Sequence, residues 1–181
     1  AFIALGSNEG DRTALILRAV EALDTEPGIS VFRVSTLLET TPVGRTDQTD
    51  FVNGVAEVRT SLSPVALLEA MLRIERSMGR RRSEGTAGGP RPIDLDLLLV
   101  EDLIERTPTL RLPHPRLHER AFVLVPMVEL DPDRIHPVQG RTMRELLAAE
   151  IAQFGRLEDR CRPVGPGPLL SGEDPGESTF T

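Results

Sequence analysis

Lysine, tryptophan and tyrosine are absent from this chain of 181 residues, and cysteine occurs once. All 21 basic residues are therefore arginine, which excludes a phosphate-binding loop of the G-x-x-x-x-G-K type, a Schiff base and a lysine general base. The single Cys161 excludes an internal disulfide framework and a cysteine-based zinc site. A net charge of −7 and only six phenylalanines disfavour nucleic-acid binding, and we expect no such partner.

Long apolar runs are missing too. None approaches the roughly 20 residues that span a membrane, so we expect a soluble, cytoplasmic protein with no membrane contact. A hydrophobic content of 39% and a charged content of 27% are typical of one globular domain. Eight of the fourteen residues from 163 to 176 are proline or glycine, which cannot form a core. We therefore expect one domain over residues 1–160 and a Pro/Gly-rich tail over 161–181.

The spacing of apolar residues predicts strands and helices in the order β-α-β-β-α-β. Strands are expected over 2–5, within 29–41, over 51–59 and over 93–100, and the helices between them over 11–27 and 63–78. Two further helices are expected, over 117–130 with an interruption at Pro126, and from the capping box of Thr142 and Glu145 to about Phe154. This is the ferredoxin-like split βαβ order. We predict an α+β fold, an antiparallel sheet with helices on one face, plus a C-terminal helix and tail.

The sharpest motif is a pair of acids, Asp94 and Asp96, at the start of the strand expected over 93–100. Residues two apart on a strand point to one face and lie about 6.6 Å apart, so the two carboxylates project together. The apolar residues of this strand should share the opposite face: Ile93, Leu95, Leu97 and Leu99. Two Mg²⁺ ions about 3.5–4 Å apart fit between such carboxylates. The alternative is a pair of surface acids neutralised by arginine.

An arginine-rich segment precedes the acidic pair. Residues 76–92 contain five arginines and one acid, a net charge of +4 within an acidic chain. This local reversal would concentrate an anion, and arginine forks beside Mg²⁺ are what a polyphosphate requires. The alternative is a solvated arginine-rich loop.

Histidines follow the predicted strand at positions 114 and 118. Their spacing suits a pair of metal ligands on a helix, but the prolines on both sides of His114 argue against a continuous helix and so against zinc. A histidine that faces phosphate is favoured. In the same segment Arg120 offers another fork, and Phe122 offers a ring face to a flat ligand.

Phe51 and Asn53 share one face of the strand expected over 51–59. An aromatic ring beside an amide that both donates and accepts is suited to the edge of a planar heterocycle. The alternative is a core phenylalanine beside a turn-capping asparagine.

Together these segments resemble the 6-hydroxymethyl-7,8-dihydropterin pyrophosphokinase family, from about residue 2 to about residue 150. The motifs that carry the resemblance are Ala4-Leu5-Gly6-Ser7-Asn8, Gly10-Asp11-Arg12, Glu39-Thr40-Thr41-Pro42, Gln48, Phe51-Val52-Asn53, Ile74-Glu75, Gly79-Arg80, Gly89-Pro90-Arg91-Pro92-Ile93-Asp94-Leu95-Asp96, Leu112-Pro113-His114-Pro115 and Glu119-Arg120-Ala121-Phe122. The resemblance implies transfer of pyrophosphate from ATP to the hydroxymethyl group of the reduced pterin, with release of AMP, for folate synthesis. It implies small-molecule partners, and we expect a monomer.

The resemblance also implies roles for single residues. Asp94 and Asp96 would hold two Mg²⁺ ions, and Arg82 and Arg91 would neutralise charge as the bond to the α-phosphate breaks. The nucleotide would contact the following residues: Glu75, Arg82, Arg91, Leu97, Arg111, His114 and Arg120. The pterin would lie between Phe51 and Phe122, and its edge would be read by Asn53 and by the backbone of Thr41, Pro42 and Val43.

The chain departs from many relatives just before Gly89, where Ala87-Gly88 stands in place of Arg-Trp in a loop about one residue longer. We therefore expect a looser loop that excludes water less well, with Gly85, Gly88 and Gly89 as hinges. Two other interpretations stay open. Another Mg²⁺-dependent phosphoryl or nucleotidyl transferase would share the acidic pair without the pterin site, and a ferredoxin-like ligand-binding module would carry out no catalysis.

Overall fold

The computed structural model describes residues 1–41, 49–80 and 89–165, and the predicted β-α-β-β-α-β order is confirmed except that the second strand is divided in two. The N-terminal half contains β1 (Phe2–Ser7), α1 (Arg12–Thr25), β2 (Ile29–Val34), β3 (Leu37–Thr40), β4 (Phe51–Thr60) and α2 (Pro64–Ser77). The C-terminal half contains β5 (Asp94–Leu99), β6 (Glu105–Arg106), β7 (Arg111–Leu112), α3 (Ala121–Leu130), α4 (Met143–Phe154) and β8 (Cys161–Val164). Short 3-10 turns occupy Leu117–Glu119 and Leu157–Asp159.

The main sheet is antiparallel and has the strand order β5-β1-β4-β3-β8, with β2 paired to β4 beside β3. The region predicted as one strand within 29–41 is divided into β2 and β3 at Ser35. The Ser35 hydroxyl accepts the Val55 N–H at 3.0 Å, while the Ser35 N–H donates to the Val55 carbonyl at 3.0 Å. A side chain thus replaces a backbone carbonyl in the ladder, and the backbone leaves the line of the strand.

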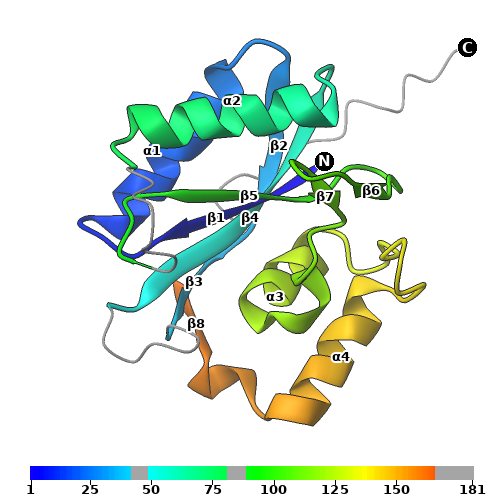
Figure 1. Ribbon diagram of the computed structural model, residues 1–181. Helices are drawn as coiled ribbons and strands as arrows, with labels where there is room; N and C mark the ends of the chain where they lie inside the picture. Colours follow the sequence, from blue (N-terminus) through cyan, green and yellow to red (C-terminus); the bar gives the residue numbers. More distant parts are fainter. Residues whose placement is uncertain (42–48, 81–88, 166–181) are drawn as a thin grey trace, which may run out of the picture.

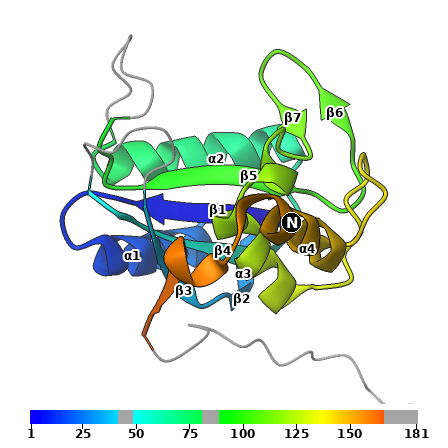
Figure 2. The same ribbon diagram turned by 90° about the horizontal axis from the view of Figure 1, so that it is seen from below.

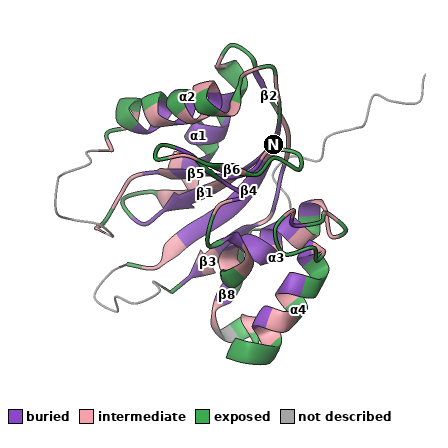
Figure 3. Ribbon diagram, turned by 45° about the vertical axis from the view of Figure 1, so that its right-hand side comes forward, coloured by how far each residue is buried: buried purple, intermediate pink, exposed green. Residues whose placement is uncertain are grey.

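Helices cover both faces of the sheet. Figures 1 and 2 show α1 and α2 on one side and α3 and α4 on the other. The predicted placement of all helices on one face was therefore wrong for the last two. The cause is that neighbouring residues of the central strands are apolar on both faces: Ile3 packs with α1 and α2, and Phe2 packs with α3 and α4. The middle of the sheet is accordingly buried on both sides (Figure 3).

A bulge in β5 changes the face that its last residues occupy. Ile3 pairs with Leu97 and Phe2 pairs with Leu99, so Leu98 has no place in the ladder. Leu99 consequently packs with Phe2 on the side of α3, and the prediction that it shares a face with the other alternate residues of the strand was wrong.

The extents of one helix and of the tail also differ from the predictions. The helix expected to be interrupted at Pro126, α3, continues through this residue, because proline removes only one helical hydrogen bond and the surrounding apolar side chains are buried. Strand β8 pairs with β3, so residues 161–164 belong to the sheet although the tail was expected to start at 161.

Within the described ranges, none of the helices has both the length and the apolar character of a membrane span.

Candidate active site

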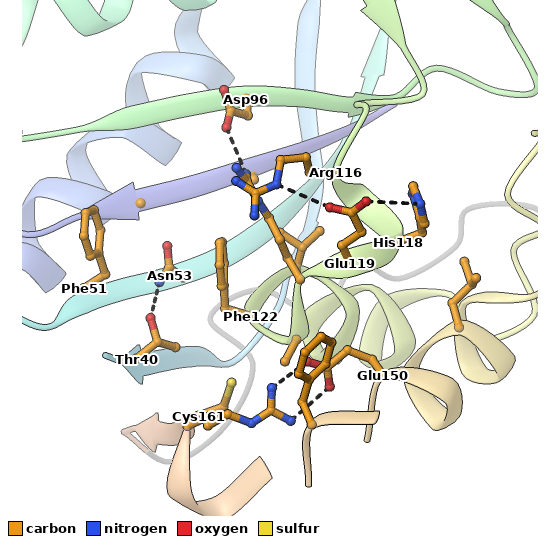
Figure 4. Close-up of a pocket in the computed structure, with 18 of the residues that line it drawn as sticks. Thr40, Phe51, Asn53, Asp96, Arg116, His118, Glu119, Phe122, Glu150 and Cys161 are labelled. Atoms are coloured by element: carbon orange, nitrogen blue, oxygen red, sulfur yellow. Dashed lines mark hydrogen bonds and ion pairs between the residues drawn. The ribbon is translucent and has the colours of Figure 1, made fainter. Parts of the chain in front are cut away.

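A cavity of about 1100 Å³ lies on the face of the sheet that carries α3 and α4 (Figure 4). Strands β1, β3, β4 and β5 form its floor, and α3, α4 and the turn before α3 form its walls. The cavity brings together these predicted site residues: Thr41, Phe51, Asn53, Arg91, Asp94, Asp96, Arg120 and Phe122.

One half of the cavity is a slot between two aromatic rings. Figure 4 shows Phe51 and Phe122 on either side of Asn53. The Asn53 Nδ2 donates to the Thr40 hydroxyl at 2.7 Å, which fixes the orientation of the buried amide. A Cβ on Gly6 would lie 3.0 Å from Asn53 Oδ1, so glycine leaves that oxygen its space. Two ring faces and a fixed amide edge are suited to a flat heterocycle.

In the other half, Asp94 lies between two guanidinium groups. It forms an ion pair with Arg80, and the Arg91 Nε lies 3.0 Å from its Oδ2. Arg80 also pairs with Glu75, whose side chain is 2% exposed and whose Oε1 accepts the Leu95 N–H at 2.8 Å. Burial lowers the pKa of Arg80, but the charges of Asp94 and Glu75 outweigh it and raise the pKa on balance. Arg80 therefore stays charged between two carboxylates.

Asp96 faces a second set of cationic or polar groups. His114 Nε2 and Arg120 Nη1 each lie 3.9 Å from its Oδ2. The Leu98 carbonyl, which the bulge frees from the ladder, accepts the His114 N–H at 2.8 Å and so holds the histidine beside β5.

The pKa values in this half favour an added cation. Burial and the neighbouring charge of Asp94 raise the pKa of Asp96 despite the attraction of His114 and Arg120. Burial lowers the pKa of His114, although Asp96 opposes this. A cation bound there would offset the burial of Asp96 and stabilise its ionised form.

The donor set fits Mg²⁺ that a ligand helps to bind. Across residues 1–41, 49–80 and 89–165, no group of three or more His, Cys, Asp or Glu side chains is placed to hold a metal ion. Mg²⁺ commonly uses one or two carboxylates and takes its other ligands from water and substrate phosphates. Asp94 and Asp96 match that arrangement.

Other predicted residues lie away from the cavity or outside the described part of the chain. The side chain of Leu97 packs in the core beneath α1 and α2, and Glu75 lies buried behind Arg80. Arg111 is exposed on β7 and lines a second cavity of about 780 Å³, which His114 shares. The following lie outside the described ranges: Pro42, Val43, Arg82, Gly85, Ala87 and Gly88.

The central position of Arg80 was not predicted. The sequence placed it only within the basic segment and in the Gly79-Arg80 motif. The chain turns back after α2, where the Arg80 N–H donates to the Glu75 carbonyl at 3.0 Å, and this turn directs Arg80 toward β5. Asn8 was also missed as a support: its Oδ1 accepts the Arg91 N–H at 2.8 Å.

Comparison with known proteins gives a consistent result. A family profile described as 7,8-dihydro-6-hydroxymethylpterin-pyrophosphokinase (HPPK) matches residues 2–132. A Bacillus subtilis protein named 2-amino-4-hydroxy-6-hydroxymethyldihydropteridine pyrophosphokinase is 45% identical over 130 residues, which are 72% of this chain and 77% of the relative. A Methylorubrum extorquens protein of the same name is 45% identical over 148 residues, 82% of this chain and 91% of the relative.

Other similar proteins are much longer. The folic acid synthesis protein fol1 of Schizosaccharomyces pombe is 42% identical over 157 residues, which cover 87% of this chain and 21% of fol1. A crystal structure of a Plasmodium falciparum HPPK-DHPS triple mutant superposes with a TM-score of 0.71 at 16% identity, covering 90% of this chain and 46% of that one. The chain thus spans about a fifth of fol1 and less than half of the HPPK-DHPS protein. At 16% identity, the similarity to HPPK-DHPS concerns the fold alone.

Proposed function

The chain belongs to the 7,8-dihydro-6-hydroxymethylpterin-pyrophosphokinase family, and from this premise we propose that the cavity on the α3 and α4 side of the sheet is its active site. The protein is an ATP-dependent pyrophosphokinase. It transfers pyrophosphate from ATP to the hydroxymethyl group of 6-hydroxymethyl-7,8-dihydropterin and releases AMP, in folate biosynthesis. The observation that supports the site is the continuity of one cavity from the acidic pair to the slot between Phe51 and Phe122.

The slot receives the pterin in this proposal. The rings of Phe51 and Phe122 stack on its two faces, and Asn53 reads its edge with the amide orientation that Thr40 imposes. Thr41 lines the same end of the cavity. Its backbone is proposed to bind the pterin edge, as are Pro42 and Val43, which lie outside the described ranges.

The triphosphate lies across the acidic half. Arg91 and Arg120 bind its oxygens as planar forks and neutralise charge as AMP leaves, and Arg82 is proposed to assist. Burial lowers the pKa of His114, and its Nδ1 accepts the Arg116 N–H at 3.1 Å, so its Nε2 is proposed to donate a hydrogen bond to a phosphate oxygen. Three further residues are proposed to contribute to nucleotide binding. Glu75 contributes by holding Arg80, and Leu97 contributes through its backbone because its side chain is in the core. Arg111 contributes from β7.

Asp94 and Asp96 are proposed to hold two Mg²⁺ ions together with the triphosphate. When bound, Mg²⁺ neutralises phosphate charge and lowers the pKa of a coordinated hydroxyl. The chain itself then has to orient the hydroxymethyl group and the triphosphate, and no strong general base is required. A monomer is proposed as the active form.

The test is product analysis with purified protein, ATP, Mg²⁺ and the reduced pterin, separated by liquid chromatography. We expect AMP and a pyrophosphorylated pterin in equal amounts. The Asp96→Asn variant should lose at least about 100-fold in kcat, the scale expected when a group that stabilises transition-state charge is removed. The matched control is Asp102→Asn, which removes an exposed carboxylate shortly after the same strand.

Each result has a distinct meaning. Release of ADP or pyrophosphate by the wild-type protein would contradict the proposed reaction. Binding of both substrates without turnover would indicate a ligand-binding module. Full activity of Asp96→Asn would leave the reaction in place and refute the assignment of the acidic pair.

A further inference from the structure

We propose that Arg12, at the start of α1, is a positioning residue for pterin binding that acts by joining the ends of β3 and β4. The inference rests on the proposed function, because it concerns the affinity of the same site for one of its two substrates. Arg12 itself does not line the cavity.

The guanidinium of Arg12 contacts both strand ends. Its Nη1 donates to the Asp50 carbonyl at 2.6 Å, and its Nη2 lies 2.9 Å from Glu39 Oε1. Thr40 and Phe51 form the last pair of the ladder between β3 and β4, and Asp50 lies just beyond it. Arg12 therefore continues the connection between the two strands past the point where their backbone pairing stops.

The position of Arg12 on its helix argues that this contact matters. It is the first residue of α1 and follows the N-cap Asp11, and the first turn itself contains no acidic residue. A cation at a helix N-terminus meets the positive end of the helix dipole, so arginine is unfavourable there for the helix itself. The contacts of Arg12 with Asp50 and Glu39 can offset this unfavourable interaction with the helix dipole. Local conflicts of this kind are most frequent at functional sites.

Arg12 acts from the face opposite to the pterin slot. Glu39 alternates with Leu38 and Thr40, and its pair across the ladder, Val52, packs in the core beneath α1 and α2. Thr40, Phe51 and Asn53 point into the cavity instead. Arg12 thus holds the backbone that carries the slot without touching its occupant.

The acidic pair of the nucleotide half lies away from this connection, whereas Arg91 approaches it through the Phe51 ring, whose centre lies 5.4 Å from the Arg91 guanidinium carbon. Asp94 and Asp96 belong to β5, and two strands, β1 and β4, separate β5 from β3. Removal of the Arg12 contacts should therefore weaken pterin binding selectively.

The experiment compares Arg12→Ala with Arg18→Ala, which removes the same charge from an exposed position on the same helix. For Arg12→Ala we expect the KM of the pterin to rise about tenfold, equivalent to ~1.4 kcal/mol of binding free energy. The KM of ATP and the kcat at saturating substrates should change less than about twofold, which is the signature of lost ground-state binding. Arg12→Lys keeps the charge but not the planar fork, so it should restore part of the pterin affinity.

The results that would overturn the inference are equally specific. They are a pterin KM of Arg12→Ala equal to that of Arg18→Ala, or a parallel rise in both Michaelis constants with a fall in melting temperature that Arg12→Lys does not reverse. Calorimetric titration with the pterin, in the presence of a non-hydrolysable ATP analogue, measures the same affinity without turnover. If the wild-type protein formed no AMP, the proposed function would fail, and this titration would still decide the role of Arg12.

Discussion

The substitution Arg80→Met tests how the acidic half of the site is held together. Arg80 forms ion pairs with Glu75 and Asp94, and its side chain is 14% exposed. Methionine keeps much of the volume and removes the charge. Asp94 would retain Arg91, whereas Glu75 would lose the Arg80 guanidinium at a position where its own side chain is 2% exposed.

The expected loss of stability in Arg80→Met follows from the burial of Glu75, the partner that would remain without Arg80. Removing one partner of a buried ion pair costs about 3–5 kcal/mol of stability. Glu75 keeps its hydrogen bond from the Leu95 N–H, so we expect the lower end, about 3 kcal/mol. For a domain of this size each kcal/mol lowers the melting temperature by about 2–4 °C, which gives a fall of about 6–12 °C. The control Arg91→Met removes a more exposed partner of Asp94 and should cost about 1 kcal/mol or less.

Urea unfolding of four proteins measures the effect: wild type, Arg80→Met, Glu75→Gln and the double variant. If the two residues interact as the structure indicates, the double variant should be more stable than the sum of the single losses implies, by at least about 1 kcal/mol. Additive losses, or an Arg80→Met protein less than about 1 kcal/mol below wild type, would refute the reasoning.

Two further predictions concern stability away from the cavity floor. Burial and the neighbouring His118 hold the pKa of His136 below its usual value, so the unfolded chain takes up a proton that the folded chain resists, and stability should fall as the pH decreases through about 6.5. His136→Gln should therefore show a smaller difference in urea midpoint between pH 7.5 and 5.5 than wild type, and an equal difference would contradict this. Thr142→Ala removes the hydroxyl that accepts the Glu145 N–H at 3.2 Å and should lower stability by about 1 kcal/mol, whereas an unchanged midpoint would show that the capping box of α4 is dispensable.

The features of the fold that the sequence predicted correctly depend on local signals. Asp11 and Ser63 are the first residues of the ranges predicted as helices, and Thr142 opens the predicted capping box. Each accepts a hydrogen bond from the backbone of the helix that it precedes. The missed features depend on distant partners. The break at Ser35 requires the Val55 backbone, and the bulge at Leu98 is defined only by the register with β1. No window of neighbouring residues contains such information.

The same distinction applies to the candidate site. The two-residue period placed Asp94 beside Asp96 and Phe51 beside Asn53, and both pairs line the cavity. Arg80 was missed because its partners come from α2 and from β5, which meet only in the folded chain. The roles assigned to these residues stay predictions until the kinetic experiments are done.

The single unpaired residue in β5 lets one short strand serve both sides of the molecule. Before Leu98 the strand presents acids to the cavity and leucines to α1 and α2, whereas Leu98 and Leu99 pack with α3 and α4. Its carbonyl also anchors His114. The number of residues in this stretch is therefore constrained more tightly than their identity. One apolar side chain can replace another. Gain or loss of a residue, in contrast, would move every later side chain of the strand to the opposite face of the sheet and would separate His114 from the two acids.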